Sequence, residues 1–259
     1  MKWTLLVSAF AAMLIVSAIP SWGQSPTPTL VNVIHVRVKP EHLQEFVDLE
    51  REALAPLKKA APNGLYQIAY RGTVGNTLEF EFLMTLGKFA DRDGENPFNK
   101  YSTERERILR GARLAQYEEN LQVTIDRRLP DLSIAPQGPL TPPTYIHMYR
   151  IRVREDRNEE FSGTVKNDLL PALRKTDVKL LLARRTALGG PADYYFAEGM
   201  EKWAELDSPP SLAKAMGADA FKKMEDKLNS AITLEEQTIW RYQPDLSYYP
   251  GATATTSSR

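Results

Sequence analysis

The segment TIDRRLPDLS, from Thr124 to Ser133, occurs a second time as TIWRYQPDLS, from Thr238 to Ser247, with seven of the ten positions identical. The two segments lie 114 residues apart, and three further pairs of similar segments follow in the same order at separations of 114 or 115 residues. These pairs are VRVKPEHLQEF (36–46) with IRVREDRNEEF (151–161), LAPL (54–57) with LLPA (169–172), and GKFAD (87–91) with EKWAE (201–205). A period above 100 residues is too long for a solenoid and indicates two domain-sized units. The decamer is therefore the end of a unit that the chain contains twice.

The matched segments divide the chain into repeats and connections. Repeat 1 spans residues 30–133 and repeat 2 spans residues 145–247. Residues 134–144 include IAPQGPLTPP and are predicted to form a linker, because proline disfavours both helix and strand interiors. Residues 248–259 contain few apolar side chains to bury and are predicted to form a flexible tail.

The N-terminal segment, residues 1–23, has the layout of a secretory signal peptide. One basic residue precedes an apolar stretch from Leu5 to Ile19, and small residues follow. Cleavage after Gly23 fits this layout, and cleavage after Ala18 is the alternative. An uncleaved anchor is the other interpretation, but the apolar stretch is shorter than the ~20 residues that a spanning helix needs. The sequence thus predicts a secreted or periplasmic protein that has no membrane partner after cleavage.

The composition excludes several classes of site. The chain has no cysteine, which rules out disulfides, thiolate metal sites, cysteine nucleophiles and a lipid-anchored signal sequence. Lys plus Arg and Asp plus Glu each number 33, so the overall charge does not favour nucleic acid as a partner. The three histidines, His35, His42 and His147, form no pair with metal-ligand spacing, so no metal site is predicted. A GxSxG motif and a glycine-rich phosphate loop are also absent.

Each repeat contains the element order strand, helix, strand, strand, helix, strand. In repeat 1, apolar side chains alternate near residues 31–38 and 78–84, which is the period of a strand. Helical spacing of apolar residues follows the first strand and occurs again near residues 102–118. Repeat 2 has the same pattern, from a strand over 145–153 to a helix over 218–231. This is the order of the ferredoxin-like βαββαβ unit, which covers one sheet face with two helices and leaves the other face bare.

Two bare sheet faces in one chain can cover each other. A domain of about 100 residues buries only a modest fraction of its surface, and a linker raises the effective concentration of its partner. We therefore expect an α+β fold in which two tandem ferredoxin-like repeats pack sheet to sheet as a pseudo-dimer within the chain.

This element order, together with the stretch YYFAEGMEKWAEL (194–206), resembles the dimeric α/β-barrel superfamily. That superfamily includes antibiotic-biosynthesis monooxygenases, EthD-like and NIPSNAP-like proteins and haem-degrading relatives. The resemblance covers both repeats and implies an intrachain α/β barrel. Haem-degrading members bind iron through a histidine of the second helix, and ERILRGARL (106–114) and AFKKMEDKL (220–228) contain none, so no cofactor is implied. Members that oxidise phenols without a cofactor combine Asn, Trp and Tyr or His, and the residues of these types here are Asn32, Trp203, Tyr195 and His35.

The alternation of the strands predicts which charged residues line the barrel. If Ile34, Val36 and Val38 face the helices, the residues between them point to the other sheet face. The inward-facing residues predicted in this way are His35, Arg37, Arg150 and Arg152 on the first strands, and Glu79, Glu81 and Asp193 on the third strands.

Two interpretations of these residues stay open. In the first, they form a polar cavity for an anionic or phenolic small molecule, with Arg37, Arg150, Arg152, Glu79 and Glu81 as binding residues. The candidate catalytic residues are then His35, as an acid or base near neutral pH, Tyr195 and Trp203. In the second, the charges form ion pairs that bridge the two sheets, and the aromatic residues belong to the core.

Three functions follow from these interpretations: binding of a small molecule between the repeats, a cofactor-independent monooxygenase-like or isomerase-like enzyme, and a non-catalytic structural or partner-binding module. The repeats differ at positions where they align, since His35 aligns with Arg150 and Asp126 with Trp240. Such differences favour one site over two.

Overall fold

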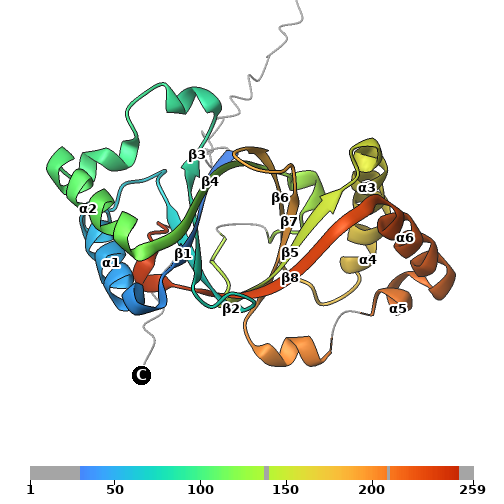
Figure 1. Cartoon of the computed structure of the whole chain (residues 1–259). Helices are drawn as coiled ribbons and strands as arrows, with labels where there is room; N and C mark the ends of the chain where they lie inside the picture. Colours follow the sequence, from blue (N-terminus) through green and yellow to red (C-terminus); the bar gives the residue numbers. More distant parts are fainter. Residues whose placement is uncertain (1–29, 137–139, 209–210, 251–259) are drawn as a thin grey trace, which may run out of the picture.

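Eight antiparallel strands close into one barrel, and the helices lie on its outside (Figure 1). The structure is a computed structural model that describes residues 30–136, 140–208 and 211–250. The first half of the chain contributes β1 (Leu30–Val38), β2 (Gln67–Val74), β3 (Glu79–Leu86) and β4 (Glu118–Arg128). The second half contributes β5 (Tyr145–Val153), β6 (Leu181–Leu188), β7 (Tyr194–Met200) and β8 (Ile232–Tyr242). The order around the barrel is β1-β3-β2-β8-β5-β7-β6-β4, so each half supplies four neighbouring strands.

The helices form two groups, one on the outer face of each half (Figure 1). The first half has α1 (Leu43–Ala60) and α2 (Glu104–Tyr117). The second half has α3 (Asn158–Thr164), α4 (Leu170–Leu173), α5 (Leu212–Met216) and α6 (Ala218–Ala231), and a π-helical turn (Val165–Leu169) joins α3 to α4. Within the described ranges, no helix is long and apolar enough to cross a membrane.

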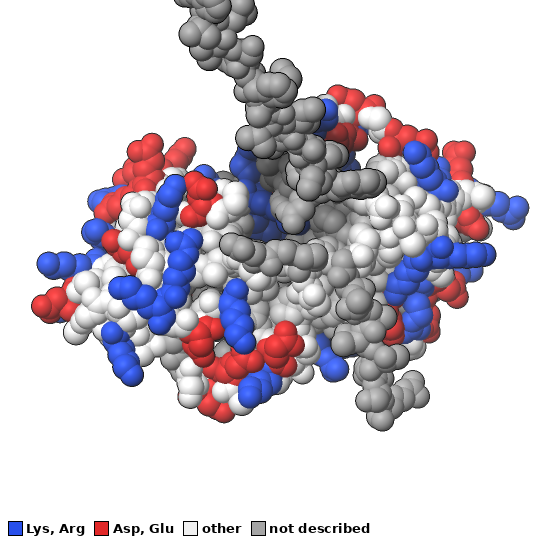
Figure 2. Space-filling model, turned by 180° about the vertical axis from the view of Figure 1, so that it is seen from behind, with Lys and Arg blue, Asp and Glu red and all other residues white. Residues whose placement is uncertain are grey.

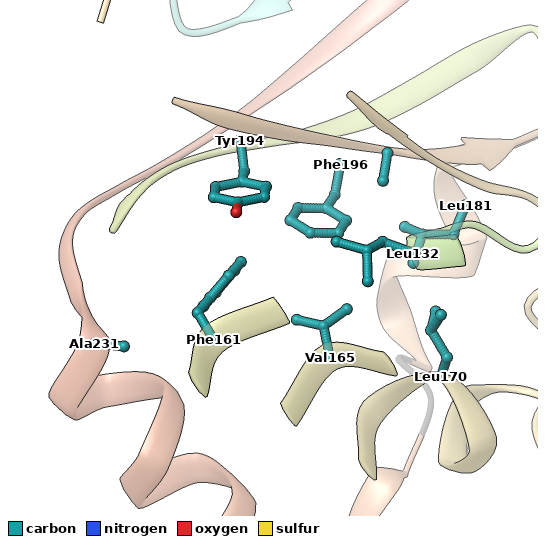
Figure 3. Close-up of a cluster of buried hydrophobic side chains, with 9 residues drawn as sticks. Leu132, Phe161, Val165, Leu170, Leu181, Tyr194, Phe196 and Ala231 are labelled. Atoms are coloured by element: carbon teal, nitrogen blue, oxygen red, sulfur yellow. The ribbon is translucent and has the colours of Figure 1, made fainter. Parts of the chain in front are cut away.

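The outward-facing residues of each sheet form a core with these helices. In the first half, Phe46 of α1 packs on Phe80 of β3 with a ring-centroid distance of 5.1 Å. In the second half, Phe161 of α3 packs on Tyr194 of β7 at 5.0 Å, and Figure 3 shows Phe161 and Val165 pointing from the helix toward the sheet. Burial of these side chains on one strand face leaves the alternate residues for the barrel interior, as the alternation predicts.

The two sheets join edge to edge, which corrects the expectation that they stack face to face. Strand β2 pairs with β8, and β4 pairs with β6, both antiparallel. We call these two lines of pairing the β2–β8 seam and the β4–β6 seam. An unpaired edge strand exposes a row of N–H and C=O groups, and closure of a barrel is the arrangement that removes such edges. Edge pairing therefore satisfies backbone groups that face-to-face stacking would leave open.

Two glycines at equivalent places allow the hairpins beside the seams to approach the neighbouring strand. Gly75 follows β2 and Gly189 follows β6, with φ angles of 98° and 93°. A Cβ atom on Gly189 would lie 2.3 Å from the carbonyl oxygen of Val123 in β4, and one on Gly75 would lie 2.9 Å from Thr238 in β8. Both the positive φ and the close approach require glycine.

The repeated decamers extend beyond the last strand of each half and pack against the opposite half. The hydroxyl of Ser133 accepts a hydrogen bond from the N–H of Ala183 in β6, and that of Ser247 accepts one from Ala69 in β2, each at 2.9 Å. Leu132 is buried in the core of the second half and Leu246 in the core of the first. Each ending therefore completes the other half rather than its own.

The predicted linker and tail lie partly within the described residues. Pro143 packs at one end of the barrel, where a Cβ atom on Gly199 of β7 would lie 3.2 Å from its Cγ atom. Tyr248, the first residue of the predicted tail, is buried and exchanges backbone hydrogen bonds with Gln67. Residues 137–139 and 251–259, and the predicted signal peptide 1–23, lie outside the described residues.

Candidate functional site

The end of the barrel opposite Pro143 contains a cavity of about 260 Å³. The inward-facing residues of the strands line it, together with Gly190 and Pro191 of the β6–β7 hairpin. Six of the residues predicted from the sequence lie on its wall: His35, Arg37, Glu79, Glu81, Arg150 and Tyr195. The alternation of β1, β3, β5 and β7 therefore brings these side chains together.

A buried network of charges lies against this cavity and crosses the β4–β6 seam. The guanidinium of Arg184, on β6, donates to Glu81 Oε2 of β3 at 2.7 Å and to Asp126 Oδ2 of β4. Thr124 donates its hydroxyl to the other oxygen of Asp126 at 2.9 Å. All four residues are buried. Burial alone would lower the pKa of Arg184, but Glu81 and Asp126 raise it above its usual value, so the guanidinium stays charged.

His35 lies beside this network with one ring nitrogen directed at a carboxylate. Its Nδ1 atom is 3.4 Å from Glu81 Oε2. A carboxylate at this position favours the tautomer with the proton on Nδ1, which leaves Nε2 as a hydrogen-bond acceptor. Burial lowers the pKa of His35 from 6.5, Glu81 raises it in part, and Arg184 lowers it further. The imidazole is therefore neutral at pH 7 and can accept a proton.

Aromatic and apolar side chains form the rest of the wall. The ring of Tyr195 lies under the guanidinium of Arg184, with 4.3 Å between the guanidinium carbon and the ring centroid. Trp240 and Met148 line the cavity and belong to an apolar cluster inside the barrel. The indole N–H of Trp240 donates to Thr238 at 2.7 Å, which fixes the orientation of its ring. The cavity thus has an aromatic side and a polar side.

The arginines on the cavity wall and beside it all contact carboxylates. Arg150 donates to Asp193 at 2.8 Å and to Glu236 at 2.9 Å. Arg152 donates to both oxygens of Asp193. Burial raises the pKa of Asp193, but the hydrogen bonds from Arg152 and Arg150 outweigh this and hold its pKa below the usual range. Arg37 forms an ion pair with Glu119 at 3.1 Å.

Three residues proposed from the sequence lie elsewhere. Trp203 is 41% exposed in a 3-10 turn and packs on Tyr145 outside the cavity, which corrects the expectation that it shares a cavity with His35. Asn32 bonds Arg92, a residue of the loop after β3, and does not line the cavity. Arg152 holds Asp193 and is absent from the cavity wall. Arg152 therefore contacts Asp193 together with Arg150.

Sequence reasoning missed two parts of the site. Arg184 lies at a position where the first half has Tyr70, and this difference could have been found from the 114-residue alignment. Gly190 and Pro191 belong to the turn between β6 and β7, and their place on the cavity wall follows from closure of the barrel. Asp126 and Trp240 occupy equivalent positions in the two halves, and the sequence alone shows this difference. Their contacts depend on which strands pair at the two seams.

Other sites are less suited to ligand chemistry. A groove of about 560 Å³ lies on the outer face of the second half, and the only ion pair between its wall residues joins Lys166 to Asp131 at 2.8 Å, both solvent-exposed. Figure 2 shows charges of both signs interspersed over the visible face, without a dominant sign. Within the described ranges, no group of three or more His, Cys, Asp or Glu residues could hold a metal ion. The cavity with His35 is therefore the candidate site.

Comparison with known proteins supports the fold. No protein-family model matches the chain, and no curated protein sequence matches it. A "putative monooxygenase" from Lactobacillus acidophilus has a TM-score of 0.56 at 10% identity, over 86% of this chain and 97% of that one. Another, from Fusobacterium nucleatum, has a TM-score of 0.55 at 12% identity, over 82% and 91%. An anthrone oxidase-like protein has a TM-score of 0.59 at 7% identity, over 89% and 97%.

At these identities the likeness concerns the fold alone. Together with the strand order, it confirms the coarse prediction of a mixed α/β barrel.

Proposed function

We propose that the protein binds a small aromatic molecule in the cavity lined by His35, Glu81, Tyr195 and Trp240. The observation that carries this proposal is the wall itself, in which a neutral imidazole and a buried carboxylate face aromatic rings across one cavity. Ligand sites combine an apolar wall with a few polar groups in this way. A volume of 260 Å³ equals about nine water molecules, which suits a ligand of one to two rings.

The proposal includes the origin and the location of the protein. The equal strand orders of the two halves and the four matched segments support a duplicated ferredoxin-like unit of the dimeric α/β-barrel superfamily. The layout of residues 1–23 supports export to a secreted or periplasmic location. In this proposal the ligand meets the protein outside the cytoplasm.

A second candidate function, cofactor-independent oxygenation, is favoured by the state of His35. Its Nε2 atom makes no hydrogen bond to any residue that the structure describes, and its imidazole is neutral at pH 7. It is therefore suited to take a proton from a phenolic hydroxyl or an activated methylene group. The names of the neighbours, monooxygenase and anthrone oxidase-like, suggest the same class of reaction.

Oxygenation of this kind balances without a reductant. His35 accepts a proton from the methylene carbon, and the carbanion reduces molecular oxygen. One oxygen atom becomes the carbonyl oxygen of the product, and the other leaves as water with the two hydrogens of the methylene group. The protein supplies a base, an apolar cavity and orientation of the ring on Tyr195 and Trp240.

Two assays on the purified protein distinguish the candidates. Calorimetric titration with 2-naphthol tests binding, and an oxygen electrode with 2-indanone, a two-ring ketone with activated methylene groups, tests oxygenation. We expect wild type to bind 2-naphthol and His35→Gln to bind it more weakly, while oxygen uptake, where present, is lost in His35→Gln. His147→Gln is the matched control, because His147 contacts Tyr149 and Gln237 outside the cavity. Binding of 2-naphthol without oxygen uptake supports a binding protein. Absence of both binding and oxygen uptake supports a structural or partner-binding module.

A further inference from the structure

Two residues on the polar side of the cavity each have a buried oxygen atom that lacks a hydrogen-bond partner within the described part of the chain. Oε1 of Glu81 and Oγ1 of Thr186 are both without a partner among the described residues. Their residues are only 2% and 5% exposed, and both line the cavity. Buried polar groups in proteins are normally hydrogen-bonded, so each such exception indicates a missing partner.

The two atoms differ in what they can bind. Glu81 binds Arg184 and contacts His35 through Oε2 only, which leaves Oε1 free. An ionised carboxylate oxygen only accepts hydrogen bonds, whereas a threonine hydroxyl can donate or accept. A ligand atom at Oε1 must therefore carry a hydrogen.

The arginines near the cavity already form ion pairs with carboxylates, so binding of an anionic ligand by them is unfavourable. Arg150 is held by Asp193 and Glu236, Arg37 by Glu119, and Arg184 by Glu81 and Asp126. An anionic ligand would have to break one of these pairs and would also lie beside the Glu81 carboxylate. Burial of an unpaired charge beside a like charge is strongly unfavourable.

We propose that the cavity selects an uncharged aromatic ligand with a hydrogen-bond donor, such as a phenol or an amide, and rejects aromatic carboxylates. Glu81 Oε1 accepts the hydrogen bond of the donor, and Thr186 Oγ1 forms the second contact. Tyr195 and Trp240 contact the ring. This inference rests on the proposed function, since it assigns the ligand class of the same cavity. Of the anionic and phenolic ligands that the sequence allows, it excludes the anionic ones.

Titration with 2-naphthamide and 2-naphthoate tests the inference, because the two molecules have nearly the same shape and differ in charge and in donors. At pH 7.5 we expect the Kd of wild type for 2-naphthamide to be at least about tenfold lower than that for 2-naphthoate. Glu81→Gln removes the carboxylate and is expected to bring the two values within about threefold of each other. The matched control is Glu235→Gln, which removes a negative charge from β8 outside the cavity and leaves Glu81 and the arginine pairs in place, so it keeps the wild-type ratio.

Thr186→Val keeps the fold, because Oγ1 makes no hydrogen bond, and it weakens 2-naphthamide binding by about two- to tenfold. Equal or tighter binding of 2-naphthoate by wild type overturns the inference and leaves the proposed function standing. A ratio that collapses equally in Glu235→Gln also overturns it, since general charge would then explain the selectivity. If 2-naphthol and both of these ligands fail to bind, the proposed function fails and the inference fails with it.

Discussion

Replacement of Arg184 by methionine tests whether the charge network stabilises the β4–β6 seam. Among the described residues, Arg184 is the only cation that forms ion pairs with both Glu81 and Asp126, and the side chains of all three residues are at most 8% exposed. Arg184→Met leaves two buried carboxylates without a cation, and breaking a buried ion pair in this way costs about 3–5 kcal/mol. For a protein of this size, each kcal/mol lowers Tm by about 2–4 °C, so we expect Tm to fall by about 6–20 °C.

The matched control is Arg185→Met, one residue further along β6. Arg185 faces outward, where its guanidinium carbon lies 4.9 Å from the centroid of the Tyr194 ring. Loss of such a contact at a solvent-exposed site costs about 0.5–1 kcal/mol. Urea denaturation of wild type and both variants at pH 7 gives the free energies of unfolding directly. An Arg184→Met protein as stable as Arg185→Met contradicts the reasoning.

A triple variant distinguishes unpaired charge from lost packing as the cause of the lower stability of Arg184→Met. Adding Glu81→Gln and Asp126→Asn to Arg184→Met removes both unpaired charges with little change in shape. An unpaired charge costs far more to bury than a neutral polar group of the same shape. We therefore expect the triple variant to recover most of the lost free energy of unfolding. A triple variant no more stable than Arg184→Met would show that packing, and not charge, is responsible.

Four further predictions concern other parts of the molecule. Gly199→Ala is expected to lose about 1–3 kcal/mol of stability in urea denaturation, since its Cβ atom would lie 2.7 Å from Leu180 Cδ2. Leu246→Ala should destabilise the protein by about 2–5 kcal/mol, with the loss of near-UV circular dichroism showing whether the halves unfold together. Trp203→Ala should leave the Kd for 2-naphthol unchanged, because Trp203 lies outside the cavity. Because the pKa of His35 is lower in the folded protein than in the unfolded chain, the unfolded chain takes up the imidazole proton at a higher pH. The free energy of unfolding should therefore fall as the pH drops below 6.5. Urea denaturation of His35→Gln at several pH values should show a smaller fall.

Much of the fold could be predicted because it depends on local patterns. The period-two alternation in β1 and β5 places His35, Arg37 and Arg150 on the inner face, where the structure has them. The helix predicted over 218–231 has the bounds of α6, Ala218–Ala231. These features follow from side-chain direction and spacing, which one strand or helix determines by itself.

The seams could not be predicted, because they depend on how two separate sheets meet. Arg184 acquires its role only when β6 lies beside β4, and no local pattern specifies that pairing. Trp203 was misplaced for a related reason. Its segment matches Phe89 in the first half, and both residues are exposed in 3-10 turns that follow the third strand of their half. An aromatic residue in such a turn can face either the cavity or solvent, and the sequence does not distinguish these cases.

The two halves share an architecture but differ in the residues of their inner faces. The repeated decamers make equivalent contacts in both halves, whereas the residues inside the barrel do not. Each decamer must fit the same kind of groove on the opposite half, so Ser133 and Ser247 make equivalent hydrogen bonds and a change in either would disturb the closure of the barrel. The inner face has no such duplicated requirement. At the β4–β6 seam it carries Arg184 and Asp126, while at the β2–β8 seam the equivalent positions carry Tyr70 and Trp240 in an apolar cluster. An enclosed space between one polar seam and one aromatic seam is suited to a ligand with a ring and a polar group, and two identical seams would not supply that pairing.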